Sequence, residues 1–291
     1  MIDFDRDKCT RCLACYEVCP SATIGLRKID SKKEVFERFP ESCIACGHCM
    51  AVCDPHAIRH ELLIYDDFEQ LEPVDISPGS MRNLLLARRS VRKYRKDQVP
   101  DDMVDSLIEV ATHAGTGGNL QTVGFTVIKD GELLDRLEAA THDVLWNSGL
   151  KLFDRKSLVP LLRLKFGKEA TEQLQRYHDS MKRKRDNDEL AGGVFRGAPM
   201  AILAHDKKNN NMGQVNCAIA IRNIEVMAMT LGLGTCWAGF LISAAKLRSK
   251  VINPMIDLDD SRAVYGALMV GYPKYEYDFK LPRVKRRLTV L

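Results

Sequence analysis

The sequence predicts an α+β protein of two domains, a small cysteine-rich domain followed by a larger one in which helices dominate and strands are scattered. Three observations support this prediction. The chain has 291 residues, about twice the length of an average domain. Eight of its ten cysteines lie between positions 9 and 53. After position 80, helical and extended segments follow one another without the regular alternation of a doubly wound sheet.

The composition is that of a folded protein outside the membrane. Apolar residues make up 45% of the chain and charged residues 28%, and no run of 18 apolar residues could span a bilayer. The first cysteine stands at position 9, which leaves no room for a secretory signal sequence. We therefore expect a cytoplasmic protein without membrane contact. Cysteines rarely form disulfides in that reducing compartment, so metal or cluster ligation is the leading interpretation of the N-terminal block.

The cysteines of this block form an internal repeat. Both runs have the spacing C-x2-C-x2-C-x3-C, which lets three thiolates surround one cubane iron–sulfur cluster. Zinc sites would use C-x2-C pairs separated by longer loops, so the spacing favours two 4Fe-4S clusters over a pair of zinc sites. At a constant offset of 34 residues, Cys9, Cys12, Cys15 and Cys19 recur as Cys43, Cys46, Cys49 and Cys53.

The repeat resembles a bacterial ferredoxin that holds two 4Fe-4S clusters. In that family the fourth cysteine of each run ligates the other cluster. The resemblance therefore implies one cluster held by Cys9, Cys12, Cys15 and Cys53, and a second held by Cys43, Cys46, Cys49 and Cys19. Two such clusters with their thiolates carry negative charge that offsets the formal net charge of +4. Nucleic-acid binding is therefore not expected.

Residues 66–80 are acidic and contain Pro73, Pro78 and Gly79, which predicts a linker between a first domain at 1–65 and a second at 81–291. The segment 215–234 is apolar nearly all round, which predicts a central helix buried on most faces and is explained by a dimer interface. The other segments of the second domain predict helices at 81–90, from 101 onward and at 131–141, and strands at 125–130, 199–205 and 263–271.

Four features of the second domain suit a flavin. Three arginines and a serine crowd into the start of RRSVRKY (88–94), and guanidinium groups bind phosphate oxygens in a forked geometry. The glycines of GTGGNLQ (115–121) let the backbone approach a ligand, beside two side-chain amides. GLGTCWAGF (232–240) and the basic RVKRR (283–287) complete the set. Taken alone, an arginine cluster is more often a solvated face.

The order and spacing of these features resemble the nitroreductase family of FMN enzymes over residues 80–291. In that family the arginine–serine segment contacts the FMN phosphate and ring edge. The family segment that corresponds to GLGTCWAGF packs near flavin N5. The resemblance implies FMN binding by Arg88, Arg89, Ser90, Arg92, Thr116, Asn119, Gln121, Ala238, Gly239, Lys285 and Arg287. It also implies a homodimer with FMN at the subunit interface. A cation such as Arg92 would stabilise the negative charge of a reduced flavin near N1.

The sequence departs from the family at two places. Thr122 and Val123 follow Gln121 where Pro-Trp is common, and Ala238 stands where many members carry Glu. These changes leave the substrate class and the reductant open. Residues 142–195 match no part of the family pattern, and we expect only a lid over the substrate there. The two remaining cysteines, Cys217 and Cys236, lie among apolar residues, as core cysteines do.

The two resemblances together predict an iron–sulfur flavoprotein oxidoreductase that passes electrons from two 4Fe-4S clusters to FMN. The expected acceptor is a small organic molecule: a nitroaromatic, a quinone, an enone or similar. Ferredoxin or another low-potential donor would supply electrons, with NAD(P)H and the reverse order of flow as open alternatives. The alternative from another class is a non-catalytic electron carrier or redox sensor with a docking flavin domain. No catalytic residue is assigned.

Overall fold

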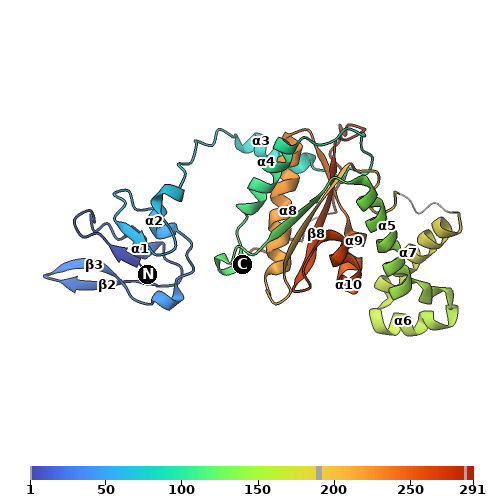
Figure 1. The fold of residues 1–291 in the computed structure, drawn as a ribbon, viewed down its shortest axis with the longest axis horizontal. Coiled ribbons are helices and arrows are strands. Elements are labelled where there is room, and N and C mark those ends of the chain that lie inside the picture. The colour runs from blue at the N-terminus through green and yellow to red at the C-terminus, as the bar shows by residue number, and fades with distance from the viewer. Residues whose placement is uncertain (1, 188–191, 285–286) are drawn as a thin grey trace. The chain divides into compact units, whose positions relative to one another are not determined.

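The computed structural model describes residues 2–187, 192–284 and 287–291. By its contacts the chain divides into two compact units (Figure 1). The first comprises residues 1–76 with 117–120, and the second comprises residues 77–116 with 121–291. Within the described ranges, every helix is too short or too polar to cross a lipid bilayer.

The first unit consists of short elements around a small core. Strand β1 (Ile2–Phe4) pairs antiparallel with β4 (Ile58–His60), and β2 (Ile24–Ile29) forms a hairpin with β3 (Lys32–Glu37). The two four-residue helices are α1 (Ala14–Glu17) and α2 (His48–Ala51). The 3-10 turns are η1 (Pro40–Ser42) and η2 (Tyr65–Asp67). The core side chains are Ile2, Phe4, Ile24, Val35, Met50 and Ile58, and six of the cysteines pack against them.

The sequence repeat of the first unit is also a backbone repeat. Helices α1 and α2 start 34 residues apart, and so do the buried strand residues Ile24 and Ile58. Left-handed backbone conformations recur at the same offset: Arg11 and Leu13 match Ala45 and Gly47, and Ala22 matches His56. This region disfavours a Cβ, yet only one of the six residues is a glycine. The shared conformations therefore show that both cysteine loops form the same turn.

The second unit has a four-stranded antiparallel sheet in the order β5-β6-β8-β7. The strands are β5 (Gly124–Ile128), β6 (Met200–Lys207), β7 (Gly234–Trp237) and β8 (Arg262–Gly271). Strand β6 is buried over most of its length, as expected for a sheet covered by helices on both sides. An antiparallel sheet between helices confirms the predicted α+β class and differs from a doubly wound fold.

Helices cover both faces of this sheet, and the alternation of side chains along β6 assigns each face. Met200, Ile202 and Ala204 pack into one cluster with α4 (Asp101–Thr112) and α8 (Gly213–Thr230). Ala201 and Leu203 face the other cluster, which contains α5 (Gly131–Ser148), α9 (Gly239–Leu247) and α10 (Ser249–Ile252). Both clusters are therefore built from one period-two pattern.

Local capping explains several helix starts. In α3 (Pro78–Ala87) the Ser77 hydroxyl accepts a hydrogen bond from Ser80 N at 3.0 Å, and Pro78 occupies the first turn. Asp130 caps α5 by accepting from Glu132 N and Leu133 N. The region expected only as a lid contains the end of α5 and two further helices, α6 (Val159–Phe166) and α7 (Lys168–Asp186). The remaining 3-10 segments are η3 (Gly117–Asn119), η4 (Leu150–Asp154), η5 (Lys156–Leu158) and η6 (Asn253–Ile256).

Candidate functional site

The eight N-terminal cysteines line two separate cavities in the first unit. One cavity is bordered by Cys9, Cys12, Cys15 and Cys53. The other is bordered by Cys19, Cys43, Cys46 and Cys49. Each cavity therefore joins three cysteines of one run with the last cysteine of the other run, which is the grouping that the ferredoxin resemblance implies. We call these the first and the second cysteine cavity.

The sulfur atoms of these cavities lie between the core and the loop backbone. Burial raises the pKa of Cys15 and that of Cys49 to about 11, and neighbouring cysteines add to both shifts. A bound cationic centre would stabilise the thiolate form of these two buried cysteines. This donor chemistry fits an iron–sulfur cluster, whose iron ions are held by cysteine thiolates.

Backbone N–H groups point at the fourth cysteine of each run. Ala57 N donates to Cys53 Sγ at 3.3 Å. Burial opposes ionisation of Cys19, but hydrogen bonds from the backbone N–H groups of Ile24, Ser21 and Thr23 outweigh it and hold the pKa of Cys19 below its usual value. Hydrogen bonds of this kind to sulfur stabilise the thiolate and tune a cluster's reduction potential.

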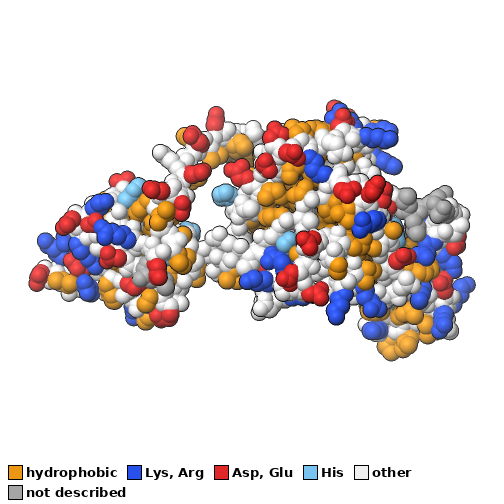
Figure 2. Space-filling view, viewed as in Figure 1, with side chains coloured by type: hydrophobic (Ala, Val, Ile, Leu, Met, Phe, Trp, Pro, Cys, Tyr) orange, Lys and Arg blue, Asp and Glu red, His pale blue; other side chains and the backbone are white. Residues whose placement is uncertain are grey.

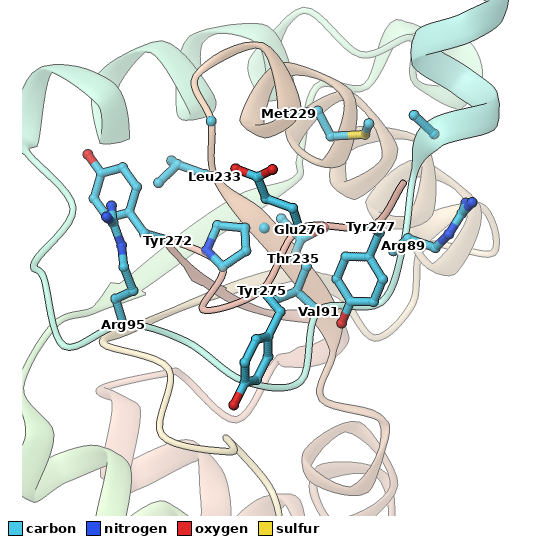
Figure 3. A pocket seen from close by; sticks show the side chains of 14 residues that line it. Arg89, Val91, Arg95, Met229, Leu233, Thr235, Tyr272, Tyr275, Glu276 and Tyr277 are labelled. Carbon is cyan, nitrogen blue, oxygen red and sulfur yellow. The ribbon is translucent and has the colours of Figure 1, made fainter. Parts of the chain in front are cut away.

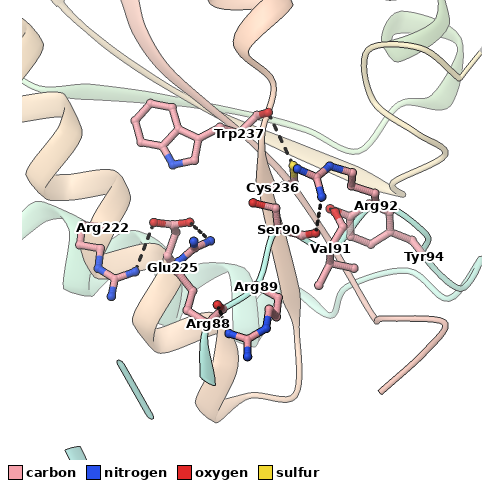
Figure 4. Close-up of polar contacts among 10 residues, drawn as sticks. All are labelled: Arg88, Arg89, Ser90, Val91, Arg92, Tyr94, Arg222, Glu225, Cys236 and Trp237. Carbon is pink, nitrogen blue, oxygen red and sulfur yellow. Dashed lines mark hydrogen bonds and ion pairs between the residues drawn. The ribbon is translucent and has the colours of Figure 1, made fainter. Parts of the chain in front are cut away.

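In the second unit, the arginine-rich segment runs alongside the edge strand β7 (Figure 4). Ser90 forms a parallel bridge with Thr235, and Val91 N donates to Thr235 O at 2.9 Å. Gly234 permits this approach, because a Cβ atom there would lie 2.5 Å from Val91 Cγ2. Strand β7 leads directly into Ala238 and Gly239, so two of the predicted flavin segments lie side by side.

Alternation along the extended segment separates the predicted flavin residues onto two sides. Arg89, Val91 and Arg95 line a cavity of about 410 Å³ together with residues 232–235, 272–273 and 275–277 (Figure 3). Ser90 and Arg92 do not line that cavity; the Arg92 guanidinium is exposed and donates to Ser90 O at 3.4 Å, near Cys236 and Trp237 in Figure 4. The structure therefore groups Ser90 and Arg92 apart from Arg89.

Arg89 binds backbone carbonyls in this structure. Its guanidinium donates to Leu86 O at 3.0 Å and Arg88 O at 2.8 Å, at the end of α3, and to Phe279 O at 2.5 Å in the C-terminal segment. Its Nε is buried without a hydrogen-bond partner among the described residues. The carbonyls that end α3 need donors, and the Arg89 guanidinium supplies them. The phosphate contact of Arg89 stays a prediction.

Arg88 belongs to a charged network with helix α8 (Figure 4). The Glu225 side chain is only 7% exposed and lies 3.5 Å from Arg88 NH1 and 3.4 Å from Arg222 NH1. A buried carboxylate needs such partners, because an unpaired charge in the interior is costly. Two arginines against one carboxylate leave net positive charge beside Ser90, which suits an anionic group such as a phosphate.

Ala238 and Gly239 stand at the start of α9. Ala238 is buried and its N–H donates to Ala267 O at 2.9 Å in β8, whereas Gly239 is exposed and faces open space. No side chain caps α9 at Ala238. The N–H groups of the first turn therefore remain available beside Trp237, which is 38% exposed. The positive end of a nine-residue helix at this point favours negative charge.

The predicted amide-bearing turn is closed on itself. Gln121 N donates to Thr116 Oγ1 at 3.1 Å, and Gly118, Asn119 and Gln121 all adopt left-handed backbone conformations. By its contacts Asn119 belongs to the first unit, where its side-chain amide donates to the carbonyls of Ile44 and Ala45, each at 3.0 Å. Thr116 and Gln121 belong to the second unit.

The remaining predictions fall at the C-terminus and at the isolated cysteines. Arg287 is exposed, and Lys285 lies outside the described residues. Cys217 is fully buried in α8, and burial raises its pKa to about 12, so this thiol stays protonated. Cys236 is buried too, and its Sγ lies 3.7 Å from Trp237 O. Both positions are those of core cysteines.

Sequence reasoning missed several residues of these sites. Thr235, which pairs with Ser90, and Trp237, beside Arg92, lie inside a motif that was recognised without a role for either residue. Glu225 had a usable signal, since it interrupts an otherwise apolar helix and buried charges are paired. His60, whose Nε2 lies 3.4 Å from Cys43 Sγ, carries no signal in the spacing of the cysteines.

Comparisons with known proteins define the class of this chain. A 4Fe-4S dicluster domain matches residues 1–54, and the nitroreductase family matches residues 85–272. The second match covers more than half of the chain. The protein therefore belongs to the nitroreductase family of FMN-dependent oxidoreductases and carries an N-terminal 4Fe-4S dicluster domain.

Individual relatives agree with both assignments. A protein of Archaeoglobus fulgidus, provisionally named an NADH dehydrogenase/NAD(P)H nitroreductase, is 23% identical over 67% of this chain and 87% of its own length. The ferredoxin-type protein NapH of Haemophilus influenzae is 42% identical over 50 residues, 17% of each chain. The crystal structure of a nitroreductase with bound FMN from Bacteroides fragilis covers 73% of this chain and 98% of its own, with 21% identity and a TM-score of 0.56. This last likeness shows the fold.

Proposed function

We propose that this protein reduces a small organic acceptor at an FMN held by the second unit, with electrons supplied through two 4Fe-4S clusters held by the first. The acceptor is a nitroaromatic, quinone, enone or similar compound, and the donor is ferredoxin or another low-potential one-electron reductant. Iron–sulfur clusters carry single electrons, and flavin accepts electrons singly and delivers them in pairs or as hydride. That chemistry explains why one chain would combine the two.

The observation that carries the proposal is the crosswise grouping of the cysteines. Each cavity offers four sulfur ligands, and each fourth ligand receives backbone N–H groups. We assign Cys9, Cys12, Cys15 and Cys53 to one cluster, and Cys43, Cys46, Cys49 and Cys19 to the other. Cysteines that form no disulfide suit a reducing compartment, so we propose that the protein is cytoplasmic.

The flavin part of the proposal rests on three neighbouring features. Arg88 offers charge and Ser90 a hydroxyl, Arg92 presents an exposed guanidinium, and α9 begins at Gly239 without a side-chain cap from Ala238. Arg88 and Ser90 would hold the phosphate, and Arg92 would stabilise negative charge on the ring. The family pattern adds Arg89, Thr116, Asn119, Gln121, Ala238, Lys285 and Arg287 as further FMN contacts.

We propose a homodimer formed through α8. Its outer face carries Val215 and Ile219, which are 47% and 42% exposed, beside Ala218 and Arg222 in a shallow groove. Hydrophobic side chains gather over the α4 and α8 region in Figure 2. An exposed apolar stripe on a central helix marks an interaction surface. A second copy of this chain would cover the stripe with its own, as in a two-fold symmetric interface.

Protein purified without oxygen should contain about eight irons and about one FMN per chain, and its mass in solution should be that of a dimer. It should turn over a quinone or nitroaromatic in excess of enzyme when a low-potential one-electron donor is supplied. Metal analysis, chromatography of the released flavin and light scattering measure the composition. Zinc in place of iron would contradict the cluster assignment, and reduction limited to one equivalent would favour the electron carrier or sensor.

Arg88→Ala should weaken FMN binding roughly 10- to 100-fold, because charge-assisted hydrogen bonds contribute about 1.5–3 kcal/mol. The measurement is fluorescence titration of flavin-free protein with FMN. Arg82→Ala is the matched control, because Arg82 is an exposed arginine of α3, the helix that ends just before Arg88, and should leave the affinity unchanged. Equal FMN affinity in the Arg88 variant would mean that this arginine serves only to pair with Glu225.

A further inference from the structure

The two cysteine cavities have matching backbones but different side-chain donors. In the second cavity, His60 Nε2 lies 3.4 Å from Cys43 Sγ. The residue 34 positions earlier in the repeat is Leu26, an aliphatic side chain that packs on the core and has no donor. The repeat therefore supplies an internal comparison: its second half has a histidine at the position where its first half has a leucine.

The tautomer of His60 follows from its other hydrogen bond. Leu62 N donates to His60 Nδ1 at 3.0 Å, so Nδ1 is the acceptor nitrogen of the ring. In the neutral imidazole the proton then resides on Nε2. His60 is held with its N–H directed at Cys43 Sγ, and its side chain is only 8% exposed.

A second difference falls on the same cavity. The Ser21 hydroxyl lies 3.9 Å from Cys19 Sγ and 3.0 Å from Thr23 Oγ1, so it can pass a weak hydrogen bond to the sulfur. The residue at the matching position is Pro55, which lacks both a hydroxyl and a backbone N–H. Both asymmetric side-chain donors therefore act on the second cavity.

The first cavity has a polar neighbour of a different kind. The buried hydroxyl of Tyr65 lies beside Cys53, and burial together with that thiol raises the pKa of Tyr65 to about 12. The hydroxyl makes no hydrogen bond of ordinary geometry within the described part of the chain. It therefore does not match the aligned N–H that His60 presents to Cys43.

We propose that His60, assisted by Ser21, raises the reduction potential of the cluster held by Cys19, Cys43, Cys46 and Cys49 above that of the cluster in the first cavity. Reduction adds one electron to a cluster and its thiolates, and a donor hydrogen bond stabilises the more negative state more strongly. A single electron shared between the two sites then resides mainly in the second cavity. His60 acts through Cys43 Sγ and is a positioning and tuning residue.

The inference rests on the proposed cluster binding, and redox titration followed by electron paramagnetic resonance tests it. The full-length protein should show two midpoint potentials. His60→Leu, which copies the residue of the first half, should lower the higher midpoint on the order of 59 mV, a tenfold change in a one-electron equilibrium, and leave the lower one in place. His60→Gln keeps an N–H donor and should restore part of the shift.

Two controls make the result specific. His113→Leu removes an exposed histidine of the second unit that lines neither cysteine cavity, and should leave both potentials unchanged. In protein labelled with ¹⁵N-histidine, electron–nuclear double resonance of the singly reduced state should detect a nitrogen coupling that His60→Leu abolishes. The iron content distinguishes a failure of the proposed function from a failure of this inference. Protein that binds no iron would contradict the proposed function itself. Clusters that form but show equal potentials, or an equal response to His60→Leu and His113→Leu, would overturn the inference.

Discussion

Cys19→Ser should eliminate the cluster assigned to Cys43, Cys46 and Cys49, and leave the cluster nearest to it in sequence intact. The iron content should fall by about half, because a site with three cysteines and one hydroxyl binds a 4Fe-4S cluster poorly. The structure gives the reason: Cys19 borders the second cavity, while Cys9, Cys12 and Cys15 border the first together with Cys53.

The reciprocal variant is the matched control for this experiment. Cys53→Ser should remove the other cluster, and the paramagnetic signals of the two variants should together account for the signal of the unchanged protein. A buried cysteine outside the cavities, Cys217, controls for the loss of a thiol as such, and Cys217→Ser should keep all the iron. Loss of the Cys9 cluster in the Cys19 variant would mean that each run holds its own cluster.

The sequence predicted more of the first unit than of the second, because the first unit contains an internal repeat. The cysteines of the two loops have the same spacing at a constant offset of 34 residues, so we expect the two loops to form the same turn. The backbone conformation of Arg11 is indeed that of Ala45, and the conformation of Leu13 is that of Gly47. The repeat does not reveal what approaches the sulfur atoms from outside. His60 reaches Cys43 only because β4 pairs with β1, and that pairing joins residues more than 50 positions apart.

In the second unit, apolar periodicity located the long elements but misjudged their ends. The helix predicted at 215–234 ends at Thr230 in the structure. The prediction was too long because the apolar run of the sequence continues past Thr230 into the edge strand β7. Helix α7 was missed because its buried side chains include Thr171 and His178 with only one large apolar residue, Met181. Charged and polar residues dominate this helix, so its few apolar positions do not stand out in the composition.

The flavin site shows a different limit of sequence analysis. Three arginines within five residues indicate affinity for an anion, but they do not show which side each one faces. That depends on the extended backbone at Ser90 and on its bridge to Thr235, a contact between distant parts of the chain. The bridge sets Arg92 apart from Arg89, which binds carbonyl groups at the end of α3. Which of them touches FMN stays a prediction.

A chain beginning at Ser77 should keep FMN but lose turnover with a low-potential one-electron donor, by roughly 100-fold or more. Ser77 is the correct starting residue because its hydroxyl caps α3, and the helices on both faces of the β5-β6-β8-β7 sheet lie beyond it. The truncated protein should still be reduced by dithionite, because that reagent needs no cluster. Steady-state turnover with reduced ferredoxin, compared with the dithionite-driven rate, measures the difference.

The size of the loss follows from covalent linkage. Phe68 packs on the core of the first unit, and Ser77 caps α3. The chain between them has no regular secondary structure and contains three acidic residues and one proline. Such a tether holds two units at an effective concentration in the millimolar range, so residues 1–76 added as a separate micromolar chain should restore only a small part of the rate. Equal turnover by the truncated protein would show that electrons reach the flavin directly. Stopped-flow absorbance of the full-length protein measures whether the clusters or the flavin are reduced first. Flavin absorbance that bleaches before the cluster bands would contradict the proposed direction and would mean that electrons leave the protein through the clusters.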